Sequence, residues 1–242
     1  MSTTPAPPVV LVVVPTYNER DNLPVLVRGV LAHEGYRMLV VDDNSPDGTG
    51  AVADALAAEY PGRLDVLHRT GQRGLGRSYI DGLQRAVASD ADLICQMDAD
   101  LSHNPEYLPA LAAAARTSDV VIGSRYLNGV SVVNWPLHRI FLSAFANRYI
   151  KAVTRLSPSD CTSGFRCWRR EALARLRLDA MVSDGYAFLV EMLYEARQRG
   201  CVIGEVPIIF VERRQGQSKV STPVLLESLI IPWRLILRRR RS

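Results

Sequence analysis

Short apolar runs alternate with amphipathic segments through the first half of the chain, and this alternation narrows the possible folds more than any other feature. The runs are mostly continuous and rich in β-branched residues, as in strands buried on both faces of a parallel sheet. They span residues 9–14, 38–41, 64–67, 92–96 and 119–123. Segments with apolar residues at helical spacing follow them. Strands that alternate with helices indicate βαβ units, so the sequence predicts an α/β domain with a mainly parallel central sheet.

The second half of the chain continues this domain with a less regular pattern. Its expected elements are helices at 137–156 and 185–199, a short strand at 163–168 and a longer strand at 202–211. Pro207 interrupts the last strand, which places that strand at an edge of the sheet. Neither a repeat nor a linker divides residues 9–220, so we expect one domain there. A flexible tail at 1–8 precedes it, and a basic amphipathic segment at 221–242 follows.

Composition excludes several classes of function. The 242 residues carry a net charge of only +4, and five arginines stand in the last nine positions. Four cysteines without a C-x-x-C motif argue against a zinc site or a disulfide framework, so we expect reduced thiols. The first ten residues lack the basic start and apolar core of a signal peptide. The sequence contains no run of about 18 apolar residues, so we expect no membrane-spanning helix. We expect no nucleic-acid partner.

Two carboxylates follow the apolar run at 92–96. Asp98 and Asp100 are separated by one residue, and residues i and i+2 of an extended segment point the same way. In open α/β sheets, ligands bind beyond the carboxyl ends of the strands. Carboxylates there suit Mg²⁺ or Mn²⁺, which take one or two of them together with substrate phosphates. The alternative is that both only cap the next helix, where Asn104 and Pro105 form a typical start.

Polar residues also follow the first two strands. Tyr17 and Glu19 come just after the first strand, where a ring and a carboxylate are suited to hold a nucleoside by stacking and hydrogen bonding. Asp42 ends the second strand, where an acidic residue binds ribose hydroxyls in dinucleotide-binding folds. Each could instead belong to a turn or a helix cap. Since the acidic sites meet at one sheet edge, together they predict a nucleotide site. The glycine loop at 71–76 lacks the P-loop pattern and is interpreted as a tight turn.

Eight short motifs, in order, resemble those of the polyprenol-phosphate (dolichol-phosphate) mannosyltransferases. They are V-P-T-Y-N-E (14–19), V-D-D-N-S-P-D-G-T (41–49), M-D-A-D-L-S-H (97–103), G-S-R-Y (123–126), N-W-P (134–136), S-G-F-R (163–166), E-V-P-I (205–208) and G-Q-S-K (216–219). Members of that family are inverting glycosyltransferases of family 2. The resemblance implies a single GT-A domain, which is Rossmann-like, with interfacial helices at its C-terminal end.

The resemblance implies which residues hold the donor and the metal. The base and ribose of the nucleotide would be held by Pro15, Tyr17, Glu19, Val40 and Asp42. The ribose, diphosphate and metal would lie at Asp98, Ala99 and Asp100, with Asp100 the main metal ligand. Ser102 stands where some relatives have a metal-binding Gln, and because a hydroxyl is a poorer ligand, a water could take its place. The implied cofactor is Mg²⁺ or Mn²⁺.

The resemblance also implies a basic site for the acceptor. Arg125, Arg139 and Ser143 match positions that receive the lipid phosphate, and Arg213 and Lys219 match a mobile loop that closes on the donor diphosphate. A phosphate monoester has a second pKa of about 6, so it is largely ionised at neutral pH. It therefore needs a cationic cradle, which Arg suits best, and no strong general base. The alternatives are surface ion pairs for the first two arginines and a solvated charged loop for the last two cations.

Four further polar residues are interpreted as structural. Since the attacking phosphate needs no base, His103 is expected to be a capping or supporting residue rather than a ligand. Asp160, Asp184 and Glu191 are expected to cap helices or to form buried ion pairs. The alternative is a role on the acceptor side, because Asp160 and Asp184 precede glycine-containing segments that resemble that side of the family.

The C-terminal segment predicts a contact with a membrane surface. Apolar residues and Trp233 precede four arginines at 238–241, which combines an apolar face, an interfacial Trp and a polybasic end. The alternative is a last helix packed on the core with a basic tail. We expect a peripheral protein on the cytoplasmic face of the membrane, with or without a separate membrane-anchoring subunit.

The residues and the resemblance together predict an enzyme that transfers mannose from GDP-mannose to a polyprenyl phosphate with inversion. Two alternatives stay open. One is a polyprenyl-phosphate glucosyltransferase that uses UDP-glucose, and the other is a non-catalytic module that binds a nucleotide-sugar or a lipid.

Overall fold

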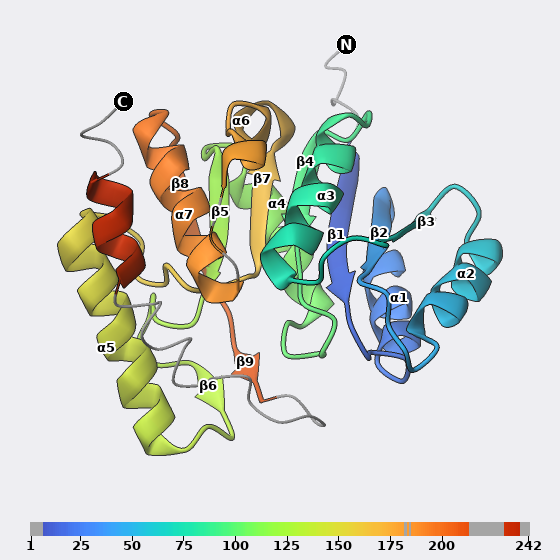
Figure 1. The fold of residues 1–242 in the computed structure, drawn as a ribbon, viewed down its shortest axis with the longest axis horizontal. Coiled ribbons are helices and arrows are strands. Elements are labelled where there is room, and N and C mark those ends of the chain that lie inside the picture. The colour runs from blue at the N-terminus through green and yellow to red at the C-terminus, as the bar shows by residue number, and fades with distance from the viewer. Residues whose placement is uncertain (1–6, 182, 184, 213–229, 238–242) are drawn as a thin grey trace, which may run out of the picture.

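The computed structural model describes residues 7–181, 183, 185–212 and 230–237. Within them, a seven-stranded sheet has the strand order β3-β2-β1-β4-β7-β5-β8, and β6 and β9 form a separate two-stranded sheet (Figure 1). The strands are β1 (Val10–Thr16), β2 (Tyr36–Asp42), β3 (Leu64–His68), β4 (Leu93–Gln96), β5 (Val120–Ser124), β6 (Val132–Val133), β7 (Arg166–Arg169), β8 (Ile203–Pro207) and β9 (Phe210–Val211).

The large sheet is parallel except at one strand. β1, β2, β3 and β4 pair in parallel, as do β5 and β8, whereas β7 is antiparallel to both β4 and β5. The prediction of a mainly parallel sheet is therefore confirmed. β8 is the last strand in the order and ends at Pro207, which confirms the expected edge position.

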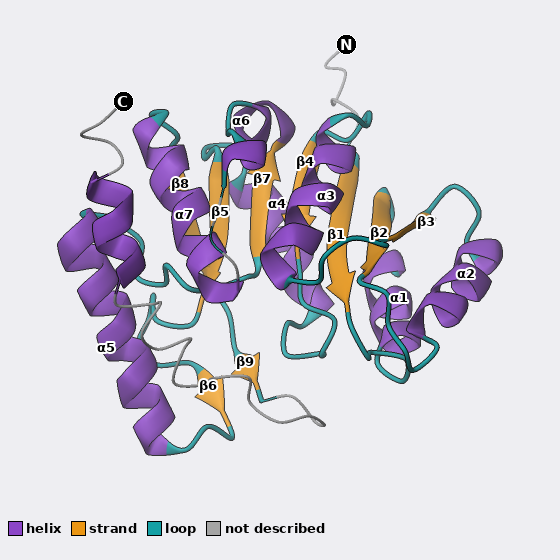
Figure 2. Cartoon of the chain, viewed as in Figure 1, coloured by secondary structure: helices purple, strands orange, loops and turns teal. Residues whose placement is uncertain are grey.

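Helices cover both faces of the large sheet (Figure 2). The α-helices are α1 (Leu23–Leu31), α2 (Thr49–Glu59), α3 (Leu75–Val87), α4 (Leu108–Ala114), α5 (Leu137–Thr154), α6 (Arg170–Ala174) and α7 (Gly185–Gln198), and the 3-10 turns are η1 (Pro105–Tyr107) and η2 (Leu178–Ala180). A further helix is described at 230–237. Side chains of β1 alternate between the faces, so Val12 packs with α1 and α4 while Val13 packs with α3 and α7.

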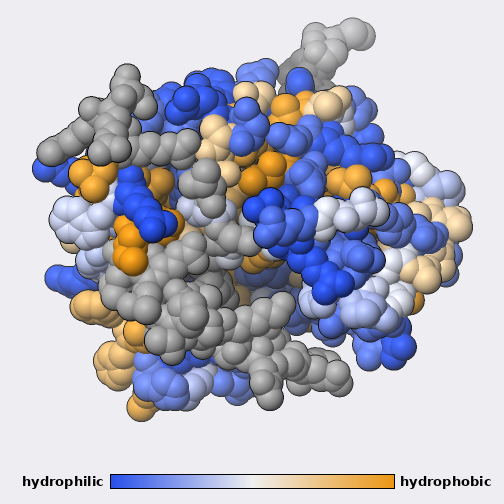
Figure 3. Space-filling model, in the orientation of Figure 1, coloured by the Kyte–Doolittle hydropathy of each residue, from blue (hydrophilic) through white to orange (hydrophobic). Residues whose placement is uncertain are grey.

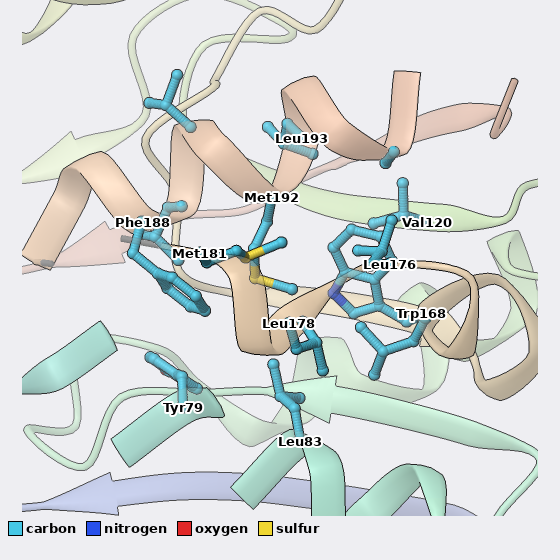
Figure 4. Close-up of a cluster of buried hydrophobic side chains, with 14 of the residues drawn as sticks. Tyr79, Leu83, Val120, Trp168, Leu176, Leu178, Met181, Phe188, Met192 and Leu193 are labelled. Atoms are coloured by element: carbon cyan, nitrogen blue, oxygen red, sulfur yellow. The ribbon is translucent and has the colours of Figure 1, made fainter. Parts of the chain in front are cut away.

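The core on the α3 and α7 side extends to the edge where the acidic motif lies. Figure 4 shows Tyr79 and Leu83 of α3 facing the helix that carries Phe188. The rings of Tyr79 and Phe188 are stacked with centroids 6.2 Å apart. Nearby, the Trp168 indole Nε1 donates a hydrogen bond of 2.7 Å to the Gln96 side chain, so the one polar atom of that buried ring is satisfied.

A glycine allows α3 to lie close against the sheet. A Cβ added at Gly82 would be 2.7 Å from methyl carbons of both Val13 and Val41. Contacts this short are absent between real side chains, so the helix can adopt this position only because the residue has no side chain. α3 thereby carries Tyr79 to the end of β4.

Local structure departs from the expectations in a few places. The helix expected after Asn104 begins as the 3-10 turn η1, and the Asn104 side chain accepts a hydrogen bond from the Glu106 backbone N–H as its cap. The strand expected at 163–168 begins later, at Arg166. None of the helices in the described ranges is long and apolar enough to cross a membrane. Most of the expected tail at 1–8 lies outside the described residues, and so does the expected C-terminal segment at 221–242 except for residues 230–237.

The helix at 230–237 packs on α5 by one side. Ile231 and Leu235 are buried in the core, and the Trp233 Nε1 donates to the Tyr149 hydroxyl at 2.8 Å. Trp233 itself is 54% exposed. The packing expected under the core-helix alternative is thus present, while part of the Trp233 ring remains exposed.

Candidate functional site

The carboxyl ends of the parallel strands meet at one edge of the sheet, the lower edge in Figure 1. Thr16 at the end of β1 is paired with Asp42 at the end of β2, and β4 runs directly into Asp98 and Asp100. The acidic sites expected to share an edge therefore do so, because parallel pairing brings the strand ends together.

Hydrogen bonds fix the first two acidic side chains. Asp42 is buried and accepts from the Thr16 hydroxyl at 3.3 Å and from the Ser45 hydroxyl at 2.6 Å. Glu19 accepts from the Asn22 side-chain amide at 2.8 Å. These hydrogen bonds from neutral donors help to hold both carboxylates in defined orientations.

Two of the residues expected at the nucleotide are buried in the sheet and its core. Pro15 is buried within β1, and the Val40 side chain packs in the core on the α1 and α2 side. Tyr17 instead lies partly exposed beyond β1. The Arg73 guanidinium carbon lies 4.9 Å from the centre of the Tyr17 ring, and its Nη1 donates to the Tyr17 hydroxyl at 2.9 Å. The sequence interpretation missed Arg73, although the glycine loop that presents it was visible.

The glycine loop at 71–76 is anchored by a buried cation. Arg69 forms an ion pair with Asp43 and another with Asp81, the latter at 2.6 Å. The Gly74 backbone N–H also donates to Asp43, at 2.9 Å. The loop is therefore held against the end of β2, and Asp43 is used for structure while its neighbour Asp42 faces the edge.

The D-x-D motif forms a tight turn with specific partners. The Tyr79 hydroxyl donates to Asp98 at 3.0 Å, and the Asp98 backbone N–H donates to the His103 Nδ1 at 3.2 Å. Asp100 accepts from both the backbone N–H of Ser102, at 3.1 Å, and its hydroxyl, at 2.5 Å. His103 is buried and stacks on an aromatic ring at 5.0 Å, as a supporting residue would.

The oxygen atoms of this turn are chemically suited to a hard divalent cation. The Asp98 side chain is 35% exposed, so its carboxylate is accessible. A Cβ added at Gly164 would lie 3.4 Å from the Asp98 Oδ1, so the glycine keeps that side open. No group of three or more His, Cys, Asp or Glu side chains placed to hold a metal occurs in the described part of the chain. A cation held here would therefore complete its ligands with phosphate or water oxygens, as Mg²⁺ usually does.

Arg125 lies just beyond β5 in a buried ion pair. Its guanidinium donates to both oxygens of Asp160, at 2.6 and 2.8 Å, and to the Thr162 hydroxyl at 2.8 Å. Burial alone would raise the pKa of Asp160, but the Arg125 guanidinium and the hydrogen bonds outweigh burial and hold that pKa below its usual range. The buried ion pair expected as one role of Asp160 is confirmed.

Arg139 and Arg125 both lie against the ring of Trp135. The guanidinium carbons lie 4.1 Å (Arg139) and 5.6 Å (Arg125) from the centre of the Trp135 ring. Arg139 also pairs with Glu212 at 2.5 Å. Ser143 follows Arg139 by four residues on α5 and so lies on the same face of the helix. The three residues expected at the acceptor phosphate are thus brought together.

The remaining expected residues are divided between described and undescribed parts. Glu191 is buried and accepts from the Ser183 backbone N–H at 3.0 Å, as a capping residue would. Arg213, Lys219 and Asp184 lie outside the described residues.

Comparison with known proteins identifies the class. Residues 11–177 match the model of the family "Glycosyl transferase family 2". The chain belongs to this family, and it is a glycosyltransferase.

Two relatives agree with the resemblance to polyprenol-phosphate mannosyltransferases. The chain is 44% identical over 221 residues to the polyprenol monophosphomannose synthase of Mycolicibacterium smegmatis, covering 90% of this chain and 83% of the relative. It is also 44% identical over 222 residues to the undecaprenyl-phosphate mannosyltransferase of Micrococcus luteus, covering 91% of each.

Solved structures confirm the GT-A fold. Glucosyl-3-phosphoglycerate synthase from Mycobacterium tuberculosis, solved with Mn²⁺, UDP and glucosyl-3-phosphoglycerate, superposes with a TM-score of 0.70. The match covers 97% of this chain and 80% of that one, at 18% identity. At this identity the likeness concerns the fold.

Proposed function

We propose that the chain transfers mannose from GDP-mannose to a polyprenyl phosphate, with inversion at the anomeric carbon. The observation that carries this proposal is the pair of clustered arginines, Arg125 and Arg139, which lies beyond the same sheet edge as the D-x-D turn. An anionic acceptor needs cations next to the donor site, whereas a neutral sugar hydroxyl does not. The names of the two relatives support mannose as the sugar and a polyprenyl phosphate as the acceptor.

On the donor side, the acidic edge would hold the nucleotide. Glu19 and Asp42, with orientations fixed by neutral donors, would accept hydrogen bonds from the base and the ribose. Pro15, Val40 and Ala99 would shape the site, and the Tyr17 ring would stack on the base.

The D-x-D turn would hold a divalent cation through Asp98 and Asp100. Mg²⁺ or Mn²⁺ bound there would offset the negative charge that develops on the leaving diphosphate. Ser102 would act on Asp100, since its hydroxyl donates to that carboxylate, or contribute its own oxygen. The Mn²⁺ and UDP bound in the M. tuberculosis structure support a divalent metal for this fold, without choosing between the two ions.

On the acceptor side, Arg125, Arg139 and Ser143 would bind the lipid phosphate. One phosphate oxygen forms a bond to the anomeric carbon of mannose as the bond from that carbon to the diphosphate oxygen breaks. The phosphate is already ionised at neutral pH, so the chain supplies orientation and positive charge and takes up no proton. Arg213 and Lys219 would add positive charge at the departing diphosphate.

We also propose that the molecule lies on a membrane surface. On α5, Leu137 and Phe141 are each 72% exposed and Phe145 is 63% exposed. Figure 3 shows apolar residues along this side of the molecule, at the left, near the helix at 230–237. Exposed aromatic and aliphatic side chains, in a chain whose sequence ends with four arginines at 238–241, suit an anionic, cytoplasmic leaflet. A membrane-anchoring subunit would be a second way to reach the lipid.

The donor can be tested by competition. The full chain is given equal concentrations of GDP-mannose and UDP-glucose with a short polyprenyl phosphate and Mg²⁺, and the lipid product is analysed by mass spectrometry. Mannosyl lipid alone is expected. Glucosyl lipid alone would keep the reaction and overturn the donor. Nucleotide binding without a lipid product from either donor would favour a binding module.

A further inference from the structure

Two buried hydrogen-bond donors in the arginine cluster have no partner. The Tyr126 hydroxyl and the Trp135 Nε1 are both buried, and neither makes a hydrogen bond within the described structure. Buried polar groups are normally paired, because leaving one unpaired destabilises the fold. Tyr126 follows Arg125 in the G-S-R-Y motif and Trp135 lies in the N-W-P motif, and the proposed function gives neither of these two side chains a role.

The other two tryptophans show that the chain normally satisfies its indole groups. The Trp168 Nε1 donates to Gln96 at 2.7 Å, and the Trp233 Nε1 donates to Tyr149 at 2.8 Å. Trp135 is the exception among the three. A buried donor that the protein itself leaves unpaired is a common feature of a site that a ligand completes.

The positions of the two donors indicate the charge of that ligand. The guanidinium carbon of Arg125 lies 5.5 Å from the centre of the Tyr126 ring and 5.6 Å from that of Trp135. The Arg139 guanidinium carbon lies 4.1 Å from the centre of the Trp135 ring. Two cations and two orphan donors in one cluster are complementary to an anion with several acceptor oxygens.

The Tyr126 hydroxyl keeps its proton in this setting. Burial raises the pKa of Tyr126, and the positive charges of Arg125 and Arg139 and the nearby Ser143 hydroxyl oppose the rise without cancelling it. The Ser143 hydroxyl influences that pKa but does not meet hydrogen-bonding geometry with Tyr126. At neutral pH the phenol of Tyr126 is therefore a hydrogen-bond donor, on a ring that lies 5.5 Å from the Arg125 guanidinium carbon.

We propose that Tyr126 and Trp135 donate hydrogen bonds to the phosphate group of the acceptor, in addition to Arg125, Arg139 and Ser143. This inference rests on the proposed function, because it assumes that the cluster receives the acceptor. A dianionic phosphate monoester offers three terminal oxygens, more than two ion-paired arginines satisfy. Neutral O–H and N–H donors add hydrogen bonds without adding repulsion between cations.

The test compares acceptor affinity with stability in Tyr126→Phe, which removes only the hydroxyl. Binding of farnesyl phosphate to the full chain is measured by calorimetry, and unfolding is followed by thermal melting. We expect binding to weaken about tenfold, as for one hydrogen bond to a charged group. The melting temperature should stay the same or rise, because the variant loses an unsatisfied buried group. A hydroxyl with a purely structural role would change stability and leave affinity unchanged.

Trp135→Phe tests the second donor. Tyr60→Phe, at the residue that follows the C-terminal end of α2, is the matched control away from the cluster. Farnesol and inorganic phosphate separate the contributions of lipid and headgroup. We expect Trp135→Phe to weaken farnesyl phosphate and inorganic phosphate binding by a similar factor and farnesol binding not at all. Unchanged phosphate affinity in both variants would overturn the inference, as would a wild-type chain that binds farnesol as tightly as farnesyl phosphate. Mannosyl transfer by the wild type, measured separately, tests the proposed function, so the two can fail independently.

Discussion

Replacing Asp160 with Asn should destabilise the fold strongly, although the side chain hardly changes in size. Asp160 is fully buried and its partner Arg125 is nearly so. The substitution leaves a buried guanidinium without its carboxylate and turns an amide N–H₂ toward it. For two charges about 4 Å apart at an effective dielectric constant of about 20, the lost attraction is roughly 4 kcal/mol. Removing one partner of a buried pair typically costs about 3–5 kcal/mol, so we expect a loss in that range.

Urea denaturation at several pH values measures this loss. Because the folded pKa of Asp160 is depressed, the ion pair contributes stability above the unfolded pKa of the carboxyl, and this contribution is lost as pH falls through the folded pKa. The difference in free energy of unfolding between the wild type and Asp160→Asn should therefore become smaller in that acid range. The double variant Arg125→Met/Asp160→Leu should recover much of the stability, since it buries no lone charge. Equal stability of Asp160→Asn and wild type at pH 7 would refute this reasoning.

Three further predictions follow from single contacts. Gly82→Ala should lower the free energy of unfolding in urea by about 1–2 kcal/mol, because the clash with two valines of the sheet outweighs the gain in helix propensity. An unchanged urea midpoint would show that α3 can shift away from the sheet without loss of stability. Ser102→Ala should raise the Mg²⁺ concentration needed for half-maximal transfer several-fold, because the Asp100 carboxylate loses a 2.5 Å hydrogen bond that orients it. An identical metal titration in the variant and the wild type would contradict this. Glu212→Gln should tighten farnesyl phosphate binding, because it releases Arg139 from a competing carboxylate, and weaker binding would argue that Glu212 orients the arginine.

The sheet and its acidic edge could be predicted because both depend on local patterns. Continuous β-branched runs identify buried parallel strands, and the residues after each run must then meet at the carboxyl edge. The resemblance of the motifs to a known family also predicted that Arg125 and Arg139 lie close together. The antiparallel insertion of β7 could not be predicted, because the pairing partner of a four-residue strand is decided by the whole sheet.

The contacts within the site depend on residues far apart in the sequence. Asp160 lies 35 residues after Arg125, and Arg73 reaches Tyr17 across 56 residues. No spacing rule connects such pairs, so the sequence left Asp160 with two possible roles and Arg73 with none. Likewise, an unpaired Trp135 Nε1 can be recognised only once the surrounding atoms are placed.

The most direct test of the central claim is transfer of radiolabelled mannose from GDP-mannose to a short polyprenyl phosphate, measured as label entering the organic phase. Wild type and Asp100→Ala are compared with Mg²⁺ and with EDTA. We expect labelled lipid only from the wild type with Mg²⁺, and the same circular dichroism spectrum from both proteins. Labelled lipid from folded Asp100→Ala, or undiminished transfer in EDTA, would contradict the role of the D-x-D turn. No labelled lipid from the wild type under any condition would contradict the proposed transfer itself.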